Sequence, residues 1–235
     1  MAAIGKMKKI ISFSLYGENP KYCIGAIENV KLQPLIYPDW ICRIYYDNSV
    51  PEKYIDELRD LKIELVDMTN SGMDNHGMFW RFLVYDDKSV ERFIVRDTDS
   101  RLNFREKYAV DEWIETDKKL HIMRDHPSHG IQILGGTWGL LNSFDFNMKD
   151  AIIKFLEIKP DFKYMDDQIF LTDLYRKYFK SHICHDEIFN FPCNLPFPTP
   201  RKELEFVGEV FDEKNNNVPE HTELLKNYLK QTNQL

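Results

Sequence analysis

Two carboxylates separated by one residue, Asp97 and Asp99, follow directly after the apolar run Phe93-Ile94-Val95. If this run is a strand, side chains at positions i and i+2 point to the same side of the backbone. Two like charges this close repel each other unless a cation lies beside them. A divalent ion suits the position, because Mg²⁺-type sites use one or two protein carboxylates and let substrate phosphates complete the shell. The spacing therefore indicates a metal site for a phosphate-bearing substrate, with a plain acidic turn as the alternative.

A second pair of carboxylates, Asp166 and Asp167, precedes an apolar stretch that is typical of a helix. Carboxylates in a first helical turn are stabilised by the helix dipole, so a structural role is one interpretation. The other is catalytic, because a positioned carboxylate can take a proton from an attacking hydroxyl group. We favour Asp167 over Asp166 for that role.

Arg81 lies between two aromatic residues, and Gly136 lies in the glycine-rich run 135–139, which is expected to form a loop. A guanidinium in an apolar setting needs a planar anionic partner, for which a diphosphate or the carboxylate of Asp97 would serve. The glycines allow the backbone to approach a ligand closely. Trp138, in the same run, could either stack on a sugar or fill the core.

His126 and His129 have a spacing that could place two metal ligands on one helix. Pro127 lies between them and predicts a loop instead. We therefore expect these histidines to contact a substrate at most, and we do not expect a zinc site.

The elements that must position these side chains alternate through the first hundred residues. Expected strands at 9–15, 40–46, 63–66 and 91–96 are separated by expected helices at 20–33, from 51 onward, and at 77–85. This alternation is typical of a mostly parallel sheet covered by helices. Pro34 is expected to end the first helix. Further helices are expected at 105–115, 148–156 and 166–178, with strands at 120–123 and 181–184.

Composition restricts the class of protein. The chain has 235 residues, of which 43% are hydrophobic and 14% aromatic, which is enough for one domain with a substantial core. A net charge of −7 provides no basic stripe for nucleic acid. The four cysteines have no paired metal spacing and are too few for a disulfide scaffold, so a cytoplasmic location is expected. No apolar stretch approaches the roughly 20 residues of a membrane span, and no signal peptide is evident.

Three segments are expected along the chain. Residues 1–6 are interpreted as an added leader, 7–211 as the functional domain, and 212–235 as a polar linker followed by an amphipathic helix. The helix is expected to pack on the domain, while a homodimer contact or a membrane contact are the alternatives.

With these motifs in this order, the chain resembles the GT-A family of nucleotide-sugar-dependent glycosyltransferases, especially the compact bacterial and large-virus polysaccharide type. The segments that carry the resemblance are 13–17, 80–82, 96–101, 124–127, 135–139, 166–168 and 185–186. The resemblance implies a single α/β domain, with a mixed, mostly parallel sheet flanked by helices. It also implies that Asp97-Thr98-Asp99 is the DxD motif.

The same resemblance implies a ligand set. Mn²⁺ or Mg²⁺ would be bound by Asp97, Asp99 and His185, the last being the candidate for a ligand from the C-terminal half. The nucleotide-diphosphate sugar would contact, by the same resemblance, Ser14, Tyr16, Arg81, Asp97, Gly136 and Trp138. Segment 166–168 would supply the catalytic base of an inverting enzyme, or bind sugar hydroxyls in a retaining one.

We therefore expect a metal-dependent glycosyltransferase that moves a sugar from a UDP- or GDP-sugar to a hydroxyl group of a glycan acceptor. A catalytically weak module that binds nucleotide sugars or glycans is one alternative. A sugar nucleotidyltransferase is another, although residues 16–19 lack the glycine-rich basic loop that such enzymes usually carry. The haloacid-dehalogenase phosphatases also use a DxD motif, but normally on their first strand, whereas three expected strands precede it here.

Overall fold

The computed structural model describes residues 7–161, 163, 165–189, 191 and 194–235, so the interpreted leader at 1–6 lies outside the described residues. One eight-stranded sheet has the order β3-β2-β1-β4-β6-β5-β7-β8. Its strands are β1 (Lys8–Leu15), β2 (Ile41–Tyr46), β3 (Glu64–Asp67), β4 (Val90–Val95), β5 (Leu120–Arg124), β6 (Trp138–Leu141), β7 (His182–Asp186) and β8 (Asn194–Leu195). Among these strands only β6 runs antiparallel to its neighbours, β4 and β5.

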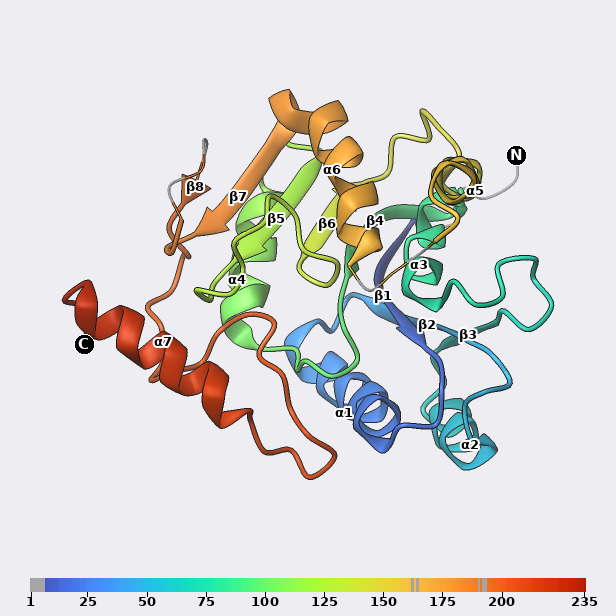
Figure 1. Cartoon of the computed structure of the whole chain (residues 1–235), viewed down its shortest axis with the longest axis horizontal. Coiled ribbons are helices and arrows are strands. Elements are labelled where there is room, and N and C mark those ends of the chain that lie inside the picture. Colours follow the sequence, from blue (N-terminus) through green and yellow to red (C-terminus); the bar gives the residue numbers. More distant parts are fainter. Residues whose placement is uncertain (1–6, 162, 164, 190, 192–193) are drawn as a thin grey trace.

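Helices cover both faces of this sheet (Figure 1). One face packs against α1 (Pro20–Ile36), α2 (Glu52–Asp60) and α4 (Phe104–Ile114). The other packs against α3 (Gly77–Trp80), α5 (Met148–Ile158) and α6 (Asp166–Tyr178). Short 3₁₀ helices, η1 (Leu83–Asp86) and η2 (Phe179–Ser181), follow α3 and α6, and α7 (Pro219–Gln231) lies at the edge of the molecule.

Neighbouring residues on the central strands contribute to opposite cores. Ile10 and Phe93 belong to the core beneath α3, α5 and α6, whereas Ile11 and Ile94 belong to the core beneath α1, α2 and α4. Because successive side chains on a strand point to opposite faces, a strand buried on both faces must be apolar throughout. This explains the uninterrupted apolar runs, and it confirms the predicted α/β fold with a mostly parallel sheet flanked by helices.

The strand order reverses next to β1. From β1 the chain adds β2 and β3 in one direction, and then returns to add β4 on the other side of β1. In open α/β sheets, ligands bind outside the carboxyl ends of the strands at such a reversal. The residues that follow β1 and β4, including Tyr16 and Asp97, therefore lie where a ligand is expected.

Two predicted element boundaries are wrong. The first helix does not end before Pro34 but continues to Ile36, because a proline in the last turn forfeits only one hydrogen bond. Burial of Ile36 and a hydrogen bond from the N–H of Tyr37 to the carbonyl of Gln33 (2.7 Å) complete that turn. The single helix predicted over 77–85 is divided into α3 and η1.

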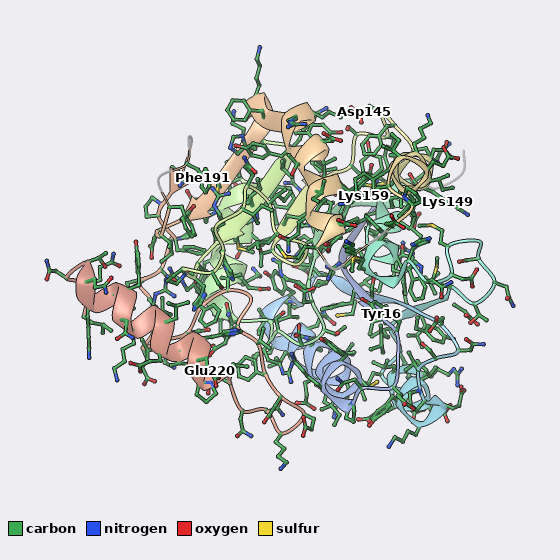
Figure 2. The ribbon with its side chains drawn as sticks, in the orientation of Figure 1. Tyr16, Asp145, Lys149, Lys159, Phe191 and Glu220 are labelled. Atoms are coloured by element: carbon green, nitrogen blue, oxygen red, sulfur yellow. The ribbon has the colours of Figure 1, made fainter. Side chains whose placement is uncertain are left out.

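A strand was also missed. The expected glycine-rich loop ends after Thr137, and Trp138–Leu141 forms β6 between β4 and β5. The chain that follows β6 is hydrogen-bonded to two helices. Asp145, labelled in Figure 2, accepts hydrogen bonds from the hydroxyl groups of Tyr85 (2.7 Å) and Tyr178 (2.8 Å), and so connects η1 with α6.

The C-terminal helix packs on the domain. Leu225 and Leu229 of α7 are buried against Phe206, and the Tyr228 hydroxyl donates a hydrogen bond to the carbonyl of Ile188 (3.0 Å). The segment 212–218, predicted as a polar linker, contains a tight turn closed by a bridge between Phe211 and Asn217. Within the described residues, no helix is long and apolar enough to span a bilayer.

Candidate functional site

A cavity of about 360 Å³ opens at the carboxyl ends of β1 and β4. Seven of the predicted site residues line it: Ser14, Tyr16, Arg81, Asp97, Asp99, Gly136 and Asp167. The rest of its wall consists of Tyr22, Met78, Thr98, His129, Leu134, Gly135, Thr137, Met165, Gln168, Gly208 and Val210. Side chains from both halves of the chain therefore converge at the reversal of strand order.

The loop that carries the acidic pair is held by hydrogen bonds to its backbone. The N–H of Arg96 donates to the carbonyl of Ser12 (3.1 Å), and the hydroxyl of Ser100 donates to the carbonyl of Asp97 (2.9 Å). The carbonyl of Asp99 accepts the N–H of Phe211 (2.8 Å). The positions of both carboxylates are therefore set by the end of β4 and by the segment near residue 211.

Each carboxylate of the pair has a cationic partner in the chain. Asp97 is ion-paired with Arg81, and Asp99 with Lys21 on α1 (2.8 Å). Burial raises the pKa of Asp99 and the nearby Asp97 charge raises it further, while Lys21 opposes both effects. The repulsion expected from the sequence is thus relieved by side chains of the protein, and the Asp97 side chain, 45% exposed, still faces the cavity.

Arg81 is held in place by two serines of β1. Its N–H donates to the hydroxyl oxygen of Ser14 (2.9 Å), and its carbonyl accepts the hydroxyl of Ser12 (2.7 Å). Residues 12 and 14 share one face of β1, because side chains alternate along a strand. Ser14 was predicted from the sequence, whereas Ser12, on the same face of β1, was not.

The Arg81 guanidinium joins two distant carboxylates. It contacts Asp97 and also Asp167 on α6 (3.2 Å), although its side chain is only 8% exposed. Burial alone would lower the pKa of Arg81, but the charges of Asp97 and Asp167 raise it above its ordinary value. The predicted need of this guanidinium for an anionic partner is therefore met within the protein, and it links the end of β4 to α6.

The two glycines at 135 and 136 lie directly against the carboxylates. A Cβ atom at Gly136 would overlap Asp97 Oδ2 and come within 3.0 Å of the Asp97 backbone nitrogen. A Cβ atom at Gly135 would overlap Asp167 Oδ2 and lie 2.7 Å from an Arg81 nitrogen. Only glycine can bring the backbone so close, and the loop therefore forms the wall behind the Asp97–Arg81–Asp167 group.

The two carboxylates at the start of α6 have different positions. Asp167 lines the cavity, accepts the N–H of Gln168 (2.9 Å), and has its pKa raised by burial against the opposing effect of Arg81. Asp166 does not line it; its carboxylate is ion-paired with Lys159 and accepts the N–H of Lys163 (2.7 Å). Asp166 therefore stabilises the start of α6, and Asp167 is the carboxylate of this pair that faces the cavity.

Tyr16, labelled in the right half of Figure 2, follows β1 and forms another part of the wall. Its ring is 44% exposed and meets Trp80 edge to face at 5.9 Å. A Cβ atom at Gly77 would overlap this ring, so the glycine provides the space that Tyr16 occupies. An exposed aromatic ring held in this way can stack on a planar ligand.

Trp138 does not line the cavity. Its side chain is fully buried and packs edge to face against Phe82 (5.4 Å) and Phe93 (5.5 Å). The predicted contact of Trp138 with the sugar donor is therefore wrong, because β6 directs this side chain into the core and not into the cavity. Of the two roles considered from the sequence, filling the core is the one that the structure shows.

His185 is also outside the cavity. It lies on β7, is completely buried, and forms a hydrogen bond with His121 (2.8 Å) and a longer contact with Glu112 (3.4 Å). Burial lowers its pKa. The structure does not bring this histidine to the acidic pair, because its strand position directs the ring toward α4.

The remaining donor set fits a hard divalent ion that completes its shell from elsewhere. Among the described residues, no group of three or more His, Cys, Asp and Glu side chains is arranged to hold a metal ion. Asp97 and Asp99 provide carboxylate oxygens on one loop beside a cavity, and a Mg²⁺-type ion commonly takes only one or two such ligands. The residues therefore suit an ion that arrives with phosphate oxygens and water.

Comparison with known proteins identifies the fold. No family model matches the chain, and no curated protein matches it. The chain is similar in structure to a glycosyltransferase involved in the glycosylation of the major capsid of PBCV-1, with a TM-score of 0.51 and 14% sequence identity. The match covers 76% of this chain and 81% of that enzyme's chain. An active-site mutant of the galactosyltransferase LgtC has a TM-score of 0.51 over 93% and 95%, at 12% identity.

The glycosyltransferase GlyE of Streptococcus pneumoniae has a TM-score of 0.50 over 77% of this chain, at 14% identity, and the match spans 45% of GlyE. At such identities the likeness concerns the fold alone. The chain has the GT-A-type fold of these proteins, as the resemblance implied.

Proposed function

We propose that this protein is a metal-dependent glycosyltransferase, which transfers a sugar from a nucleotide-diphosphate sugar to a hydroxyl group of a glycan. The observation that carries this proposal is the meeting of Asp97, Arg81 and Asp167 in one cavity, at the reversal of strand order. The similar folds include glycosyltransferases, which supports the same activity.

The charge of the cavity supports the need for a divalent ion. Three carboxylates, Asp97, Asp99 and Asp167, line the cavity together with Arg81, and Lys21 pairs with Asp99 from α1. Three negative and two positive charges leave one negative charge, which repels the diphosphate of a donor. Mn²⁺ or Mg²⁺ at Asp97 and Asp99 would reverse that sign and stabilise the charge that develops on the departing diphosphate.

The other residues of the wall have complementary roles in this proposal. Tyr16 and Ser14, at the end of β1, contact the nucleoside, with Tyr16 stacking on the base. Asp167 faces the reacting sugar and acceptor, where its raised pKa suits a group that accepts a proton. Arg81 holds Asp97 and Asp167 at a fixed separation and supplies positive charge near the diphosphate.

Thermal stabilisation by UDP and GDP, each with and without Mn²⁺, tests the proposal. A ligand at 100 times its dissociation constant stabilises a protein by about 2.7 kcal/mol, which for a chain of this size raises the melting temperature by roughly 5–10 °C. We expect a Mn²⁺-dependent shift of this size with one of the two nucleotides, and its loss in Asp99→Asn. Asp173→Asn is the matched control, because Asp173 is exposed on α6 and pairs with the exposed Arg176.

The same samples separate the alternatives. Release of sugar from a UDP- or GDP-sugar, or its transfer to an acceptor, identifies the transferase. Nucleotide binding without any turnover of a donor panel identifies a binding module, and release of pyrophosphate from a nucleoside triphosphate identifies a nucleotidyltransferase. Absence of a Mn²⁺-dependent shift with every nucleotide diphosphate contradicts the proposal.

A further inference from the structure

His129 lies in the loop between β5 and β6 and lines the same cavity as the acidic pair. Its side chain is nine-tenths buried. The ring nitrogen Nδ1 accepts a hydrogen bond from the backbone N–H of Asp125 (3.1 Å). A ring nitrogen that accepts a hydrogen bond carries no proton, so the neutral imidazole must carry its single proton on Nε2.

The group that fixes this tautomer is itself held firmly. The Asp125 carboxylate pairs with Arg105 (2.8 Å) and Arg201 (2.6 Å), and it accepts the N–H of Val207 (2.9 Å). The N–H of His129 donates to the carbonyl of His126 (2.8 Å), which closes the turn between them. The direction of the Asp125 N–H, and with it the identity of the protonated ring nitrogen, is therefore set by the fold.

The opposite side of the ring faces space that a glycine keeps open. A Cβ atom at Gly208 would lie 3.8 Å from Nε2, and the φ of +82° at that residue favours glycine. No residue in the described part of the chain forms a hydrogen bond with Nε2 of His129. Burial, together with nearby His126, lowers the pKa of His129 to about 3, so the ring stays neutral at physiological pH.

From this geometry we propose that His129 donates a hydrogen bond from Nε2–H to a diphosphate oxygen of the bound nucleotide, and that it does not ligate the divalent ion. This inference rests on the proposed function, because it names the ligand of the same cavity. A metal-bound imidazole normally donates its second N–H to an acceptor. Here the atom facing Nδ1 is the N–H of Asp125, so ligation through Nε2 would leave two donors facing each other.

Two substitutions at this position separate the two ring nitrogens. His129→Asn places an amide oxygen where Nδ1 accepts from Asp125, but it removes the Nε2–H donor. His129→Gln places an amide N–H near the position of Nε2. The matched control is His221→Asn on α7, a histidine whose backbone carbonyl, and not its ring, is hydrogen-bonded to His126.

Each variant is titrated by calorimetry, first with Mn²⁺ alone and then with UDP or GDP at saturating Mn²⁺. A hydrogen bond to a charged group predicts a loss of nucleotide affinity of roughly 10- to 100-fold in His129→Asn, with recovery to within a few-fold in His129→Gln. Mn²⁺ affinity without nucleotide should stay within about two-fold of wild type in both variants. Melting temperatures and near-UV circular dichroism verify that the variants fold.

Three results overturn the inference. A loss of Mn²⁺ affinity of tenfold or more in folded His129→Asn would make the imidazole a metal ligand. Unchanged nucleotide affinity in the same variant would show that His129 does not contact the nucleotide. If His129→Gln failed to recover the affinity, the Nε2–H donor would not be the cause of the loss. If wild-type protein itself binds neither nucleotide with Mn²⁺, the proposed function fails as well, so the wild-type titration distinguishes the two failures.

Discussion

Replacement of Gly136 by alanine should displace the Asp97 carboxylate while changing the stability of the fold only slightly. The added Cβ atom would overlap Asp97 Oδ2, the oxygen that does not contact Arg81. To reach an ordinary carbon–oxygen separation, the carboxylate would have to move by roughly 1.5 Å. It can move because its side chain is 45% exposed, whereas the Asp97 backbone is held by the end of β4.

The expected effect on function is larger than the effect on stability. A displacement of about 1 Å at a reacting centre can lower a rate about 100-fold, and Asp97 would be displaced by more than this. The cost in free energy of unfolding should lie near 1 kcal/mol, the lower end of the roughly 1–3 kcal/mol for a buried group that loses a partner. Arg81 keeps two other acceptors, Asp167 (3.2 Å) and the carbonyl of Arg96 (3.3 Å).

Donor hydrolysis in the presence of Mn²⁺, measured as kcat/KM, is the assay, with urea denaturation to follow the free energy of unfolding. Gly130→Ala is the control, because Gly130 lies in the same connection between β5 and β6. Among the described residues, a Cβ atom there would meet only ring carbons of Phe189, at an ordinary 3.7 Å. We expect Gly136→Ala to lose about 100-fold in kcat/KM and Gly130→Ala to keep the wild-type value. Wild-type hydrolysis and nucleotide affinity in Gly136→Ala would refute the reasoning, since the carboxylate would then be free to move without consequence.

Three further changes test other parts of the structure. Lys21→Met should increase Mn²⁺ affinity in the absence of nucleotide by roughly two- to five-fold, measured by calorimetry, because the Lys21–Asp99 ion pair, worth about 0.2–1 kcal/mol when partly exposed, no longer competes with the metal. A lower Mn²⁺ affinity would contradict that competition. Burial alone would raise the pKa of Asp145, but hydrogen bonds from two tyrosines lower it below its ordinary value. The charged form of Asp145 therefore stabilises the fold above the unfolded-state pKa of about 3.9. Asp145→Asn should lower the free energy of unfolding by roughly 1–2 kcal/mol in urea denaturation at pH 7, and this difference should shrink below about pH 4. A difference that does not depend on pH, or an equal loss in the exposed control Asp173→Asn, would argue against this. Trp138→Phe should lower the free energy of unfolding by roughly 1–3 kcal/mol and leave nucleotide affinity unchanged, since the indole fills the core; weakened nucleotide binding at unchanged stability would return Trp138 to the cavity wall.

Much of the fold and part of the cavity could be predicted from local sequence. Apolar runs separated by helical segments predicted the parallel sheet, and the position of Asp97 and Asp99 after such a run predicted their place at the end of β4. Arg81 was predicted to need an anionic partner, and its charged side chain does pair with Asp97 in a buried setting. These predictions succeed because strand ends and buried charges leave signals within a few residues.

The errors have a different physical origin. Trp138 was assigned to a glycine-rich loop, but β4 and β5 need a strand between them. A Cβ atom at residue 139 would lie only 2.8 Å from the Phe93 carbonyl oxygen, so Gly139 allows that strand to lie beside β4. His185 was placed near the metal because its residue type suits a ligand, whereas its direction depends on the register of β7 with β5. Pairing of distant strands cannot be read from short segments.

The residues that were missed lie close only in the folded chain. Lys21 reaches Asp99 from a helix 78 positions earlier, and Gly208 reaches His129 from near the C-terminus. Neither has a neighbour in sequence that marks it as part of a cavity. Ser12 is the exception, since its position two residues before Ser14 on one strand could have identified it.

The anchoring of α7 has a practical consequence for anyone who shortens or extends this protein. Leu225 and Leu229 pack against Phe206. The chain that follows Phe206 includes Gly208 and Val210, which line the cavity. The N–H of Phe211, the next residue, donates a hydrogen bond to the carbonyl of Asp99. Deletion of the last helix would therefore loosen the far side of the pocket rather than remove an idle tail. Any shortened or fused version of this protein should therefore keep α7 intact.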